Sequence, residues 1–225
     1  MRLTCLNSGS DGNGYLLECQ GEILILECGV PLMEVKKALN FDLSRLVGCY
    51  ISHGHADHSK YRRDYELLGV DIITPYDTDK IRLNAKCGGF DIQAFRLPHG
   101  EGFSYGALIR HLSGETLLFM TDYEFCTYLF KACRVNHYLV ECNYQAIYLD
   151  LDAPNKSHKV LGHSSLDTCN KFLLANKNGY MRNVVLVHLG KDSTNPKECV
   201  ETIKRSLGEY VNVDYARPNT VYELR

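Results

Sequence analysis

The sequence predicts an α/β fold: a four-layer α/β/β/α sandwich, in which two sheets pack face to face and helices cover their outer faces. Strand-like runs dominate the first half of the chain, with helical segments between them, and strand–helix alternation returns in the second half. The 225 residues suffice for a core that needs no disulfides. No linker-like stretch is visible, so we expect residues 1–225 to form a single domain.

The expected strands are short apolar runs separated by turn-forming residues. The first three are divided by the glycine-rich segment 8–14 and by Gln20-Gly21. In chain order, we expect strands at 2–6, 15–19, 22–27, 46–51, 71–74, 90–97, 103–110, 116–121, 138–142 and 184–189.

The expected helices follow the apolar spacing of an amphipathic helix. The segment 31–39 opens with Pro31 and has apolar residues at Leu32, Val35 and Leu39. Further helices are expected within 60–68, 77–86, 124–132, 164–177 and 196–206.

Composition excludes several classes of protein. The ten cysteines are scattered without a C-x-x-C pair, which favours reduced core thiols over a disulfide framework or a zinc finger. The net charge of −2 argues against a broad basic face that coats nucleic acid, although a local basic patch stays open. The first residues lack an apolar run of signal-peptide length, and no apolar run has the length of a membrane span. We therefore expect a cytoplasmic protein.

The segment SHGHADHS at 52–59 is the strongest chemical signal. It follows an apolar strand and carries His53, His55, Asp57 and His58 within six positions. Side chains alternate along a strand, so His53 and His55 share a face if strand geometry persists. Imidazole nitrogens and a carboxylate are the ligands expected for zinc, with manganese or iron as alternatives.

Three later strand ends carry further candidate ligands. His99 ends the run FRLPH, Asp122 ends LFMTD, and His188 ends VVLVH. One histidine at a strand end is weak evidence, because it is more often a polar group satisfied by its neighbours. Three such ends following the 53–58 cluster predict a two-metal site.

Along its whole length the chain resembles the metallo-β-lactamase superfamily, and within it the phosphodiesterase branch that includes ribonuclease Z and the YycJ-type (WalJ-type) exonucleases. HGHADH at 53–58, ILILECG at 23–29, GHSS at 162–165 and VHLGKDSTNP at 187–196 carry this resemblance. It implies two divalent metal ions, zinc as the expected metal and manganese as the alternative. It assigns His53, His55 and His99 to one ion and Asp57, His58 and His188 to the other. Asp122 would bridge the two.

The same resemblance suggests a catalytic pair. Glu141 in LVECNY and His163 in LGHSSLDT match the glutamate and histidine that ribonuclease Z uses near the leaving group. His163 would then donate a proton to the leaving oxygen and Glu141 would orient it; Asp57 is the third residue to which we assign a catalytic role. The alternative is that Glu141 is exposed at a strand end and that His163 caps the helix beginning near Ser164.

The chain departs from the family pattern at four positions. Glu27 stands where the family usually has an aspartate that supports the metal loop. Gly100, Tyr144 and Gly190 replace an aspartate, a histidine and a serine that are common in YycJ-type proteins. None of these changes removes a predicted ligand, but they alter groups that line the pocket.

The predicted function is phosphodiester hydrolysis in nucleic acid or nucleotides, by hydroxide activated between two metals, as in a YycJ-like exonuclease. The alternatives are a cyclic-nucleotide phosphodiesterase of the phage anti-Pycsar type, a thioesterase or lactonase, and a non-catalytic metal-binding protein. The expected partner is a nucleic acid or nucleotide and not a membrane, and family members often form homodimers. Lys60, Arg62 and Arg63 either hold a neighbouring phosphate or form a solvated helix face.

Overall fold

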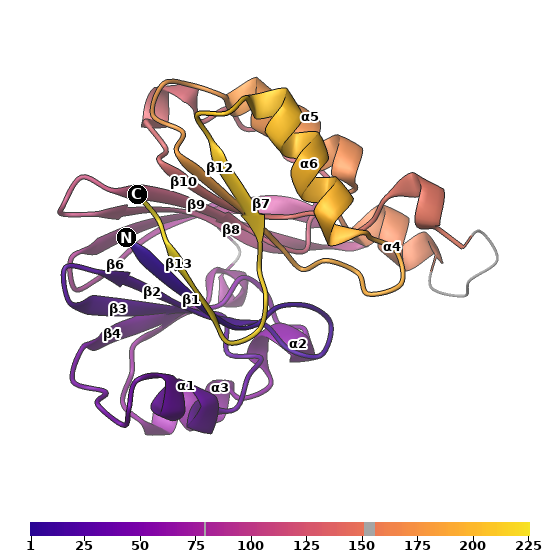
Figure 1. Cartoon of the computed structure of the whole chain (residues 1–225). Coiled ribbons are helices and arrows are strands. Elements are labelled where there is room, and N and C mark those ends of the chain that lie inside the picture. The colour runs from indigo at the N-terminus through magenta and orange to yellow at the C-terminus, as the bar shows by residue number, and fades with distance from the viewer. Residues whose placement is uncertain (79, 151–155) are drawn as a thin grey trace.

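The computed structural model describes residues 1–78, 80–150 and 156–225. Two sheets stack against each other, with helices on the outer face of each (Figure 1). This confirms the predicted four-layer sandwich.

The first sheet has the strand order β13-β1-β2-β3-β4-β5. Pairing is antiparallel from β13 to β3 and parallel from β3 to β5. The strands are β1 (Arg2–Asn7), β2 (Gly14–Cys19), β3 (Glu22–Leu26), β4 (Leu46–Tyr50), β5 (Ile72–Ile73) and β13 (Thr220–Glu223).

The second sheet has the order β12-β11-β10-β9-β8-β7-β6. It is antiparallel from β6 to β9 and parallel from β9 to β12. The strands are β6 (Arg82–Cys87), β7 (Phe90–His99), β8 (Gly102–His111), β9 (Thr116–Met120), β10 (His137–Glu141), β11 (Asn183–Val187) and β12 (Asn212–Tyr215).

Most of the helices lie on the two outer faces, and the others lie at one edge of the sheets (Figure 1). On the first sheet's side are α1 (Leu32–Ala38), α2 (Ala56–Ser59) and α3 (Arg62–Leu67); on the second sheet's side are α4 (Lys156–Gly162), α5 (Leu166–Asn176) and α6 (Pro196–Leu207). Short 3-10 turns occur at η1 (Pro75–Asp77), η2 (Lys131–Cys133) and η3 (Ala146–Tyr148). No helix in the described part of the chain is long and apolar enough to cross a membrane.

Strand β3 shows why the apolar runs are continuous. Leu24 and Leu26 point into the core between the sheets, whereas Ile23 and Ile25 belong to a separate apolar cluster with Val35 of α1. Because side chains alternate along a strand, a strand covered on both faces must be apolar at every position.

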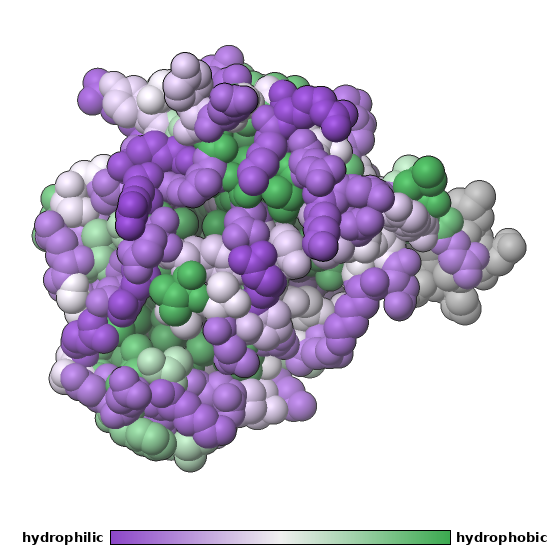
Figure 2. Space-filling model, viewed as in Figure 1, coloured by the Kyte–Doolittle hydropathy of each residue, from purple (hydrophilic) through white to green (hydrophobic). Residues whose placement is uncertain are grey.

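All ten cysteines are free and eight are buried, which confirms the prediction of reduced core thiols. Hydrophilic residues cover most of one face of the molecule, and hydrophobic residues emerge there in small separate groups (Figure 2).

Two predicted helices are wrong. Residues 82–86 of the expected helix 77–86 belong to strand β6 (Arg82–Cys87), whose inward positions Leu83, Ala85 and Cys87 alternate with exposed residues. Pairing with β7 outweighs the helix propensity of Leu, Ala and Lys. The expected helix 124–132 is irregular up to η2, because its backbone groups bond elsewhere, as when Phe130 N donates to Asn176 Oδ1 at 2.6 Å.

The other predicted elements are present, with shifted ends. Besides β6 and the short 3-10 turns, the sequence prediction missed α2, α4, β12 and β13. Strand β13 pairs with β1 although it is more than two hundred residues away in the chain, so no local pattern announces it.

Candidate metal centre

All nine predicted site residues gather at one edge of the two sheets. Their donor atoms form three overlapping groups, within each of which every pair of donor atoms lies within 4.8 Å. The first two groups correspond to the two predicted metal sites, and the third contains the predicted catalytic pair. The groups are His53, His55, His99 and Asp122; Asp57, His58, Asp122 and His188; and Asp122, Glu141, His163 and His188.

Local structure explains how the loop 53–58 contributes side chains to both of the first two groups. The chain leaves β4 in an extended course, and His55 is the N-cap of the single-turn helix α2. Asp57 and His58 lie in that turn, so their side chains leave the backbone in a different direction from His53 and His55. The expected convergence of His53 and His55 is observed, with ring centroids 4.5 Å apart.

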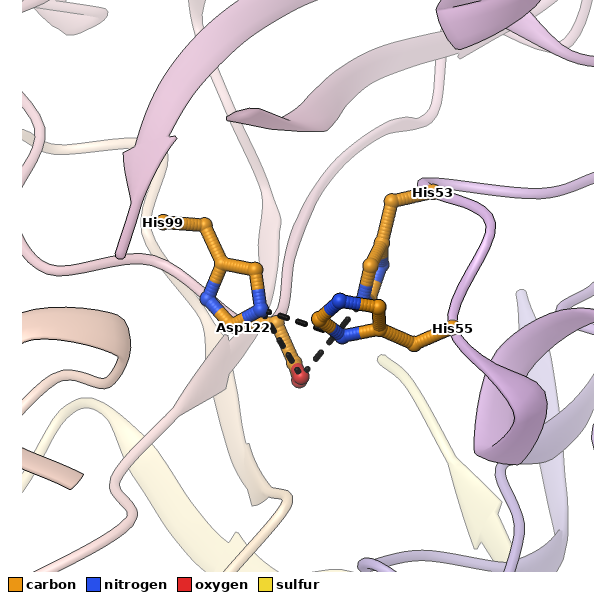
Figure 3. Close-up of side chains that lie close together, drawn as sticks. All are labelled: His53, His55, His99 and Asp122. Carbon is orange, nitrogen blue, oxygen red and sulfur yellow. Dashed lines mark hydrogen bonds and ion pairs between the residues drawn. The ribbon is translucent and has the colours of Figure 1, made fainter. Parts of the chain in front are cut away.

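Asp122 follows the end of β9 and lies beside His53, His55 and His99 of the first group (Figure 3). Its Oδ2 is 3.6 Å from His53 Nε2 and 3.9 Å from His99 Nε2. Its Oδ1 is 3.3 Å from His58 Nε2 and 3.1 Å from His188 Nδ1. The two carboxylate oxygens therefore face different groups, which is the arrangement a bridging ligand needs.

The buried charge of the site is unbalanced in a way that fits bound cations. Glu27, Asp122 and Glu141 are buried, and among the described residues their ion-pair partners are all histidines. Buried carboxylates are costly unless positive charge lies close by. His53 Nε2 also has no hydrogen-bond partner in the described part of the chain, although it is buried and faces Asp122. These observations and the donor chemistry fit two divalent metal ions.

The pKa values of the site residues also indicate that its buried carboxylates need positive charge close by. Burial alone would raise the pKa of Asp122, but His188 and His58 hold it well below its usual range. Burial opposes protonation of His188, yet Asp122, Asp57 and Glu141 raise the pKa of this imidazole to about 10. The neighbouring carboxylates therefore favour the protonated form of His188, which places positive charge beside them.

Supporting groups orient the predicted ligands. Ser52 Oγ lies 3.0 Å from His53 Nδ1, and the carbonyl of Gly162 lies 2.5 Å from His99 Nδ1. With Nδ1 occupied in this way, Nε2 of each ring is left to face the group. Asp122 and His188 adopt left-handed backbone angles, with φ of 50° and 51°. Such angles are unusual for residues other than glycine and are found at functional sites.

Glu141 and His163 form a buried hydrogen-bonded pair. His163 Nδ1 lies 2.7 Å from Glu141 Oε1, and the same oxygen lies 3.0 Å from His188 Nδ1. Glu141 Oε2 accepts a hydrogen bond from Tyr123 N at 3.0 Å. Burial disfavours the charged form of His163, but the adjacent Glu141 carboxylate raises its pKa above the usual value.

The alternative explanation of this pair is wrong. Glu141 is fully buried rather than exposed at its strand end. The N-cap of α5 is Ser165, whose side chain accepts a hydrogen bond from Thr168 N at 3.1 Å, so His163 is not the cap.

The site opens into two cavities. One, of about 350 Å³, is lined by Asp57, Asp122, His163 and His188 together with the rim residues Ser10, Asp11, Lys159, Lys191 and Asp192. The other, of about 340 Å³, lies beside His53, His55 and His99 and is bounded by Tyr76 and Phe103.

The cationic residues at the cavity rim are not those that the sequence suggested. Arg62 pairs with Glu66 and Asp77, Arg63 is exposed and pairs with Glu66, and neither lines a site cavity. This favours the solvated helix face. Lys159 and Lys191 line the larger cavity instead. Lys191 lies in the segment VHLGKDSTNP at 187–196, which the sequence analysis singled out. The position of Lys159 depends on helix α4, which was not predicted.

Comparison with solved structures identifies the fold. No protein-family model matches the chain, and no curated protein matches its sequence. The metallo-β-lactamase fold protein YhfI from Bacillus subtilis superimposes with a TM-score of 0.74 at 17% identity, covering 98% of each chain. Unliganded yeast PDE1 has a TM-score of 0.68 at 12% identity and 98% coverage of each chain. The short form of human tRNase Z has a TM-score of 0.64 at 17% identity, covering 100% of each chain. The chain therefore has the metallo-β-lactamase fold.

Proposed function

We propose that this protein is a metal-dependent phosphodiesterase that hydrolyses nucleic acid or nucleotides. The observation that carries the proposal is the Glu141–His163 pair, buried and hydrogen-bonded directly beside the carboxylate–histidine groups. A site that only bound or sensed metal would have no need of an oriented imidazole outside its two ligand groups.

Seven residues would hold the metals. His53, His55 and His99 would bind one ion, Asp57, His58 and His188 the other, and Asp122 both. Zinc is the expected metal and manganese the alternative, because the donors are imidazole and carboxylate. When bound, two such ions would supply Lewis acidity that neutralises phosphoryl charge and lowers the pKa of water.

His163 would deliver a proton to the leaving oxygen. Its Nδ1 lies against Glu141 Oε1, and Nε2 is the nitrogen that would transfer a proton to the substrate. Glu141 is itself held by Tyr123 N, so the imidazole has a defined orientation at the cavity wall. General acid catalysis of this kind contributes about 10²- to 10⁴-fold to a rate.

The need for a proton donor favours phosphodiesters over thioesters. An alkoxide is a poor leaving group without a proton, whereas a thiol has a pKa of about 8.5 and leaves readily as the thiolate. The likeness in fold to a tRNase Z and to PDE1 supports the same assignment. Within this class we favour a YycJ-like exonuclease. A cyclic-nucleotide phosphodiesterase of the phage anti-Pycsar type is the second candidate, because a cavity of about 350 Å³ suits a mononucleotide.

A substrate screen tests the proposal. Protein loaded with zinc or with manganese would be assayed on bis(p-nitrophenyl) phosphate, linear DNA, RNA, cyclic mononucleotides, a thioester and a lactone. We expect phosphodiester hydrolysis that a chelator abolishes and that the added metal restores. Hydrolysis of the thioester or lactone alone, or metal binding without any turnover, would refute the proposal.

A further inference from the structure

The rim of the larger cavity carries two lysines in different electrostatic situations. Lys191 forms an ion pair with Asp11, and Asp192 also acts on it electrostatically. Lys159 makes no ion pair with a carboxylate in residues 1–78, 80–150 and 156–225, and its Nζ donates to a neutral partner, Ser193 Oγ, at 3.2 Å. Among the described residues, the ammonium group of Lys159 therefore has no carboxylate within ion-pair distance.

Lys159 lies on the same wall as the proposed proton donor. His163 N donates a backbone hydrogen bond to the carbonyl of Lys159 at 3.1 Å, so the two residues are separated by one helical turn at the end of α4. Side chains four residues apart lie on the same side of a helix. Both residues line the larger cavity, which is the side of the site where the leaving group would depart.

The partner of Lys159 is itself held in place. Ser193 is buried, its Oγ lies 3.3 Å from the carbonyl of Asn143, and its N donates to the carbonyl of Gly190. A Cβ at position 190 would lie 2.3 Å from Ser193 Oγ, so only glycine leaves room for this hydroxyl. The departure from the family pattern at Gly190 thus accommodates the side chain that receives the hydrogen bond of Lys159.

We propose that Lys159, positioned by Ser193, binds a second phosphate, which the leaving group carries, and so selects linear oligonucleotides over cyclic mononucleotides. This inference rests on the proposed phosphodiesterase function and on His163 as the residue that faces the leaving group. An ammonium group is a compact point charge suited to a phosphate, and its interaction is strengthened where part of the side chain is withdrawn from water.

The number of phosphates separates the two substrate classes. A cyclic mononucleotide has one phosphate, which is the group under attack, so it offers nothing further to Lys159. A linear chain has a next phosphate one nucleotide from the scissile bond. The charge of Lys159 would therefore stabilise linear substrates alone.

Thymidine dinucleotides provide the test. TpT has only the scissile phosphate, whereas pTpT and TpTp carry one additional phosphate at the 5′ or the 3′ end. For one of these two the extra phosphate lies on the leaving group, whichever the polarity of cleavage. We expect Lys159→Met to lower kcat/KM for that substrate by about 10- to 100-fold, and to change TpT and bis(p-nitrophenyl) phosphate little. Ser193→Ala should reproduce the effect more weakly.

Binding gives a second readout that does not depend on turnover. Thymidine 3′,5′-bisphosphate should bind the metal-loaded wild type more tightly than thymidine 5′-monophosphate, and Lys159→Met should remove the difference. Lys171→Met is the matched control, because Lys171 is an exposed lysine on α5 that pairs with Asp167 outside the cavity. Circular dichroism would verify that each variant is folded.

The outcomes distinguish the two proposals. Failure of the wild type to cleave any phosphodiester would refute the proposed function. Cleavage with an equal effect of Lys159→Met on TpT, pTpT and TpTp would leave that function standing and overturn the role of Lys159, as would a preference of the wild type for cyclic mononucleotides.

Discussion

Glu27 lies directly behind His58: its Oε2 is 3.5 Å from His58 Nδ1, and both side chains are fully buried. Both oxygens of Glu27 also lie 3.2 Å from Ser52 N, at the start of the metal-binding loop. One carboxylate therefore connects the strand end at β3 to the backbone and to a predicted ligand of that loop. The resemblance to the family places an aspartate here, and the longer glutamate still reaches both groups.

Removing the charge of Glu27 should weaken metal binding. Groups that support a metal ligand typically contribute about 10- to 100-fold to affinity. We expect a loss of that size for Glu27→Gln, because the neutral amide no longer stabilises the proton or the orientation of His58. Competition with a chromogenic chelator would measure it, with Glu34→Gln, at a half-buried residue on α1, as control. Unchanged affinity would show that Glu27 serves only the backbone.

Neutralising Asp122 should affect both ions at once. Asp122→Asn keeps the shape of the side chain and tolerates the left-handed backbone, where alanine would add strain of about 1–2 kcal/mol. We expect the loss of affinity for two metals to exceed the roughly 10- to 100-fold typical of supporting residues, and turnover to disappear. Elemental analysis would count the metals, with Asp64→Asn as an exposed control. A variant that retains two metals and full activity contradicts the bridging role.

Replacing His163 should slow chemistry without removing metal. If His163 protonates the leaving oxygen, His163→Ala should reduce kcat on natural phosphodiesters by about 10²- to 10⁴-fold. The loss should be smaller for p-nitrophenyl substrates, since p-nitrophenolate leaves without a proton. His111→Ala is the control, because His111 pairs with Glu22 outside the site. Equal losses on both substrates, or a loss that follows missing metal, would assign His163 a structural role.

Glu141→Gln should have a broader effect than the removal of His163. Glu141 Oε1 contacts both His163 and His188, and Oε2 accepts from Tyr123 N. We therefore expect this variant to lose metal affinity as well as proton donation, and the double variant with His163→Ala to bind metal more weakly than His163→Ala alone. Parallel measurements of metal content and kcat would show it. Full metal retention would restrict Glu141 to orienting His163.

His137 should make stability sensitive to acid. Burial lowers the pKa of His137 to about 4, although Glu115 Oε2, 2.6 Å from its Nε2, opposes the shift. The folded state thus binds the proton more weakly than the unfolded chain, whose histidine has a pKa of about 6.5. The contribution of His137 to the free energy of unfolding is complete above pH 6.5 and is lost as the pH falls toward 4.

The size of this effect follows from the shift. The pKa of His137 is about 6.5 in the unfolded chain and about 4 in the folded protein. At 1.36 kcal/mol per pKa unit, this difference corresponds to about 3 kcal/mol of folding free energy. Urea denaturation of wild type and His137→Gln at pH 7 and pH 4 would measure it, and the variant should lose less stability on acidification. Acid effects at the metal centre are common to both proteins and cancel in the comparison. Parallel losses in the two proteins would rule out His137 as the source.

Local sequence alone indicated the residues of the candidate metal centre. HGHADH packs three histidines and an aspartate into six positions, and strand-end residues such as His99 and Asp122 are visible because an apolar run ends directly before them. The layered fold was predictable for the same reason, since ILIL at 23–26, a short apolar run that contains β-branched isoleucine, is typical of a strand, and the structure covers this strand on both faces. The spacing of apolar residues along the sequence indicates which positions are buried, and burial is the property that these segments have in common.

Tertiary structure decided whatever depends on partners distant in the chain. Residues 82–87 have helix-forming side chains, yet they form a strand because β7 pairs with them. The exposed alternative for Glu141 could be rejected only once His163 and His188 were seen to share its carboxylate. No sequence pattern indicated a role for Lys159, because its position depends on Ser193, 34 residues away, and on the space left by Gly190. A sequence pattern records which side chains prefer to be buried, but only the folded chain brings separate segments to within hydrogen-bond distance.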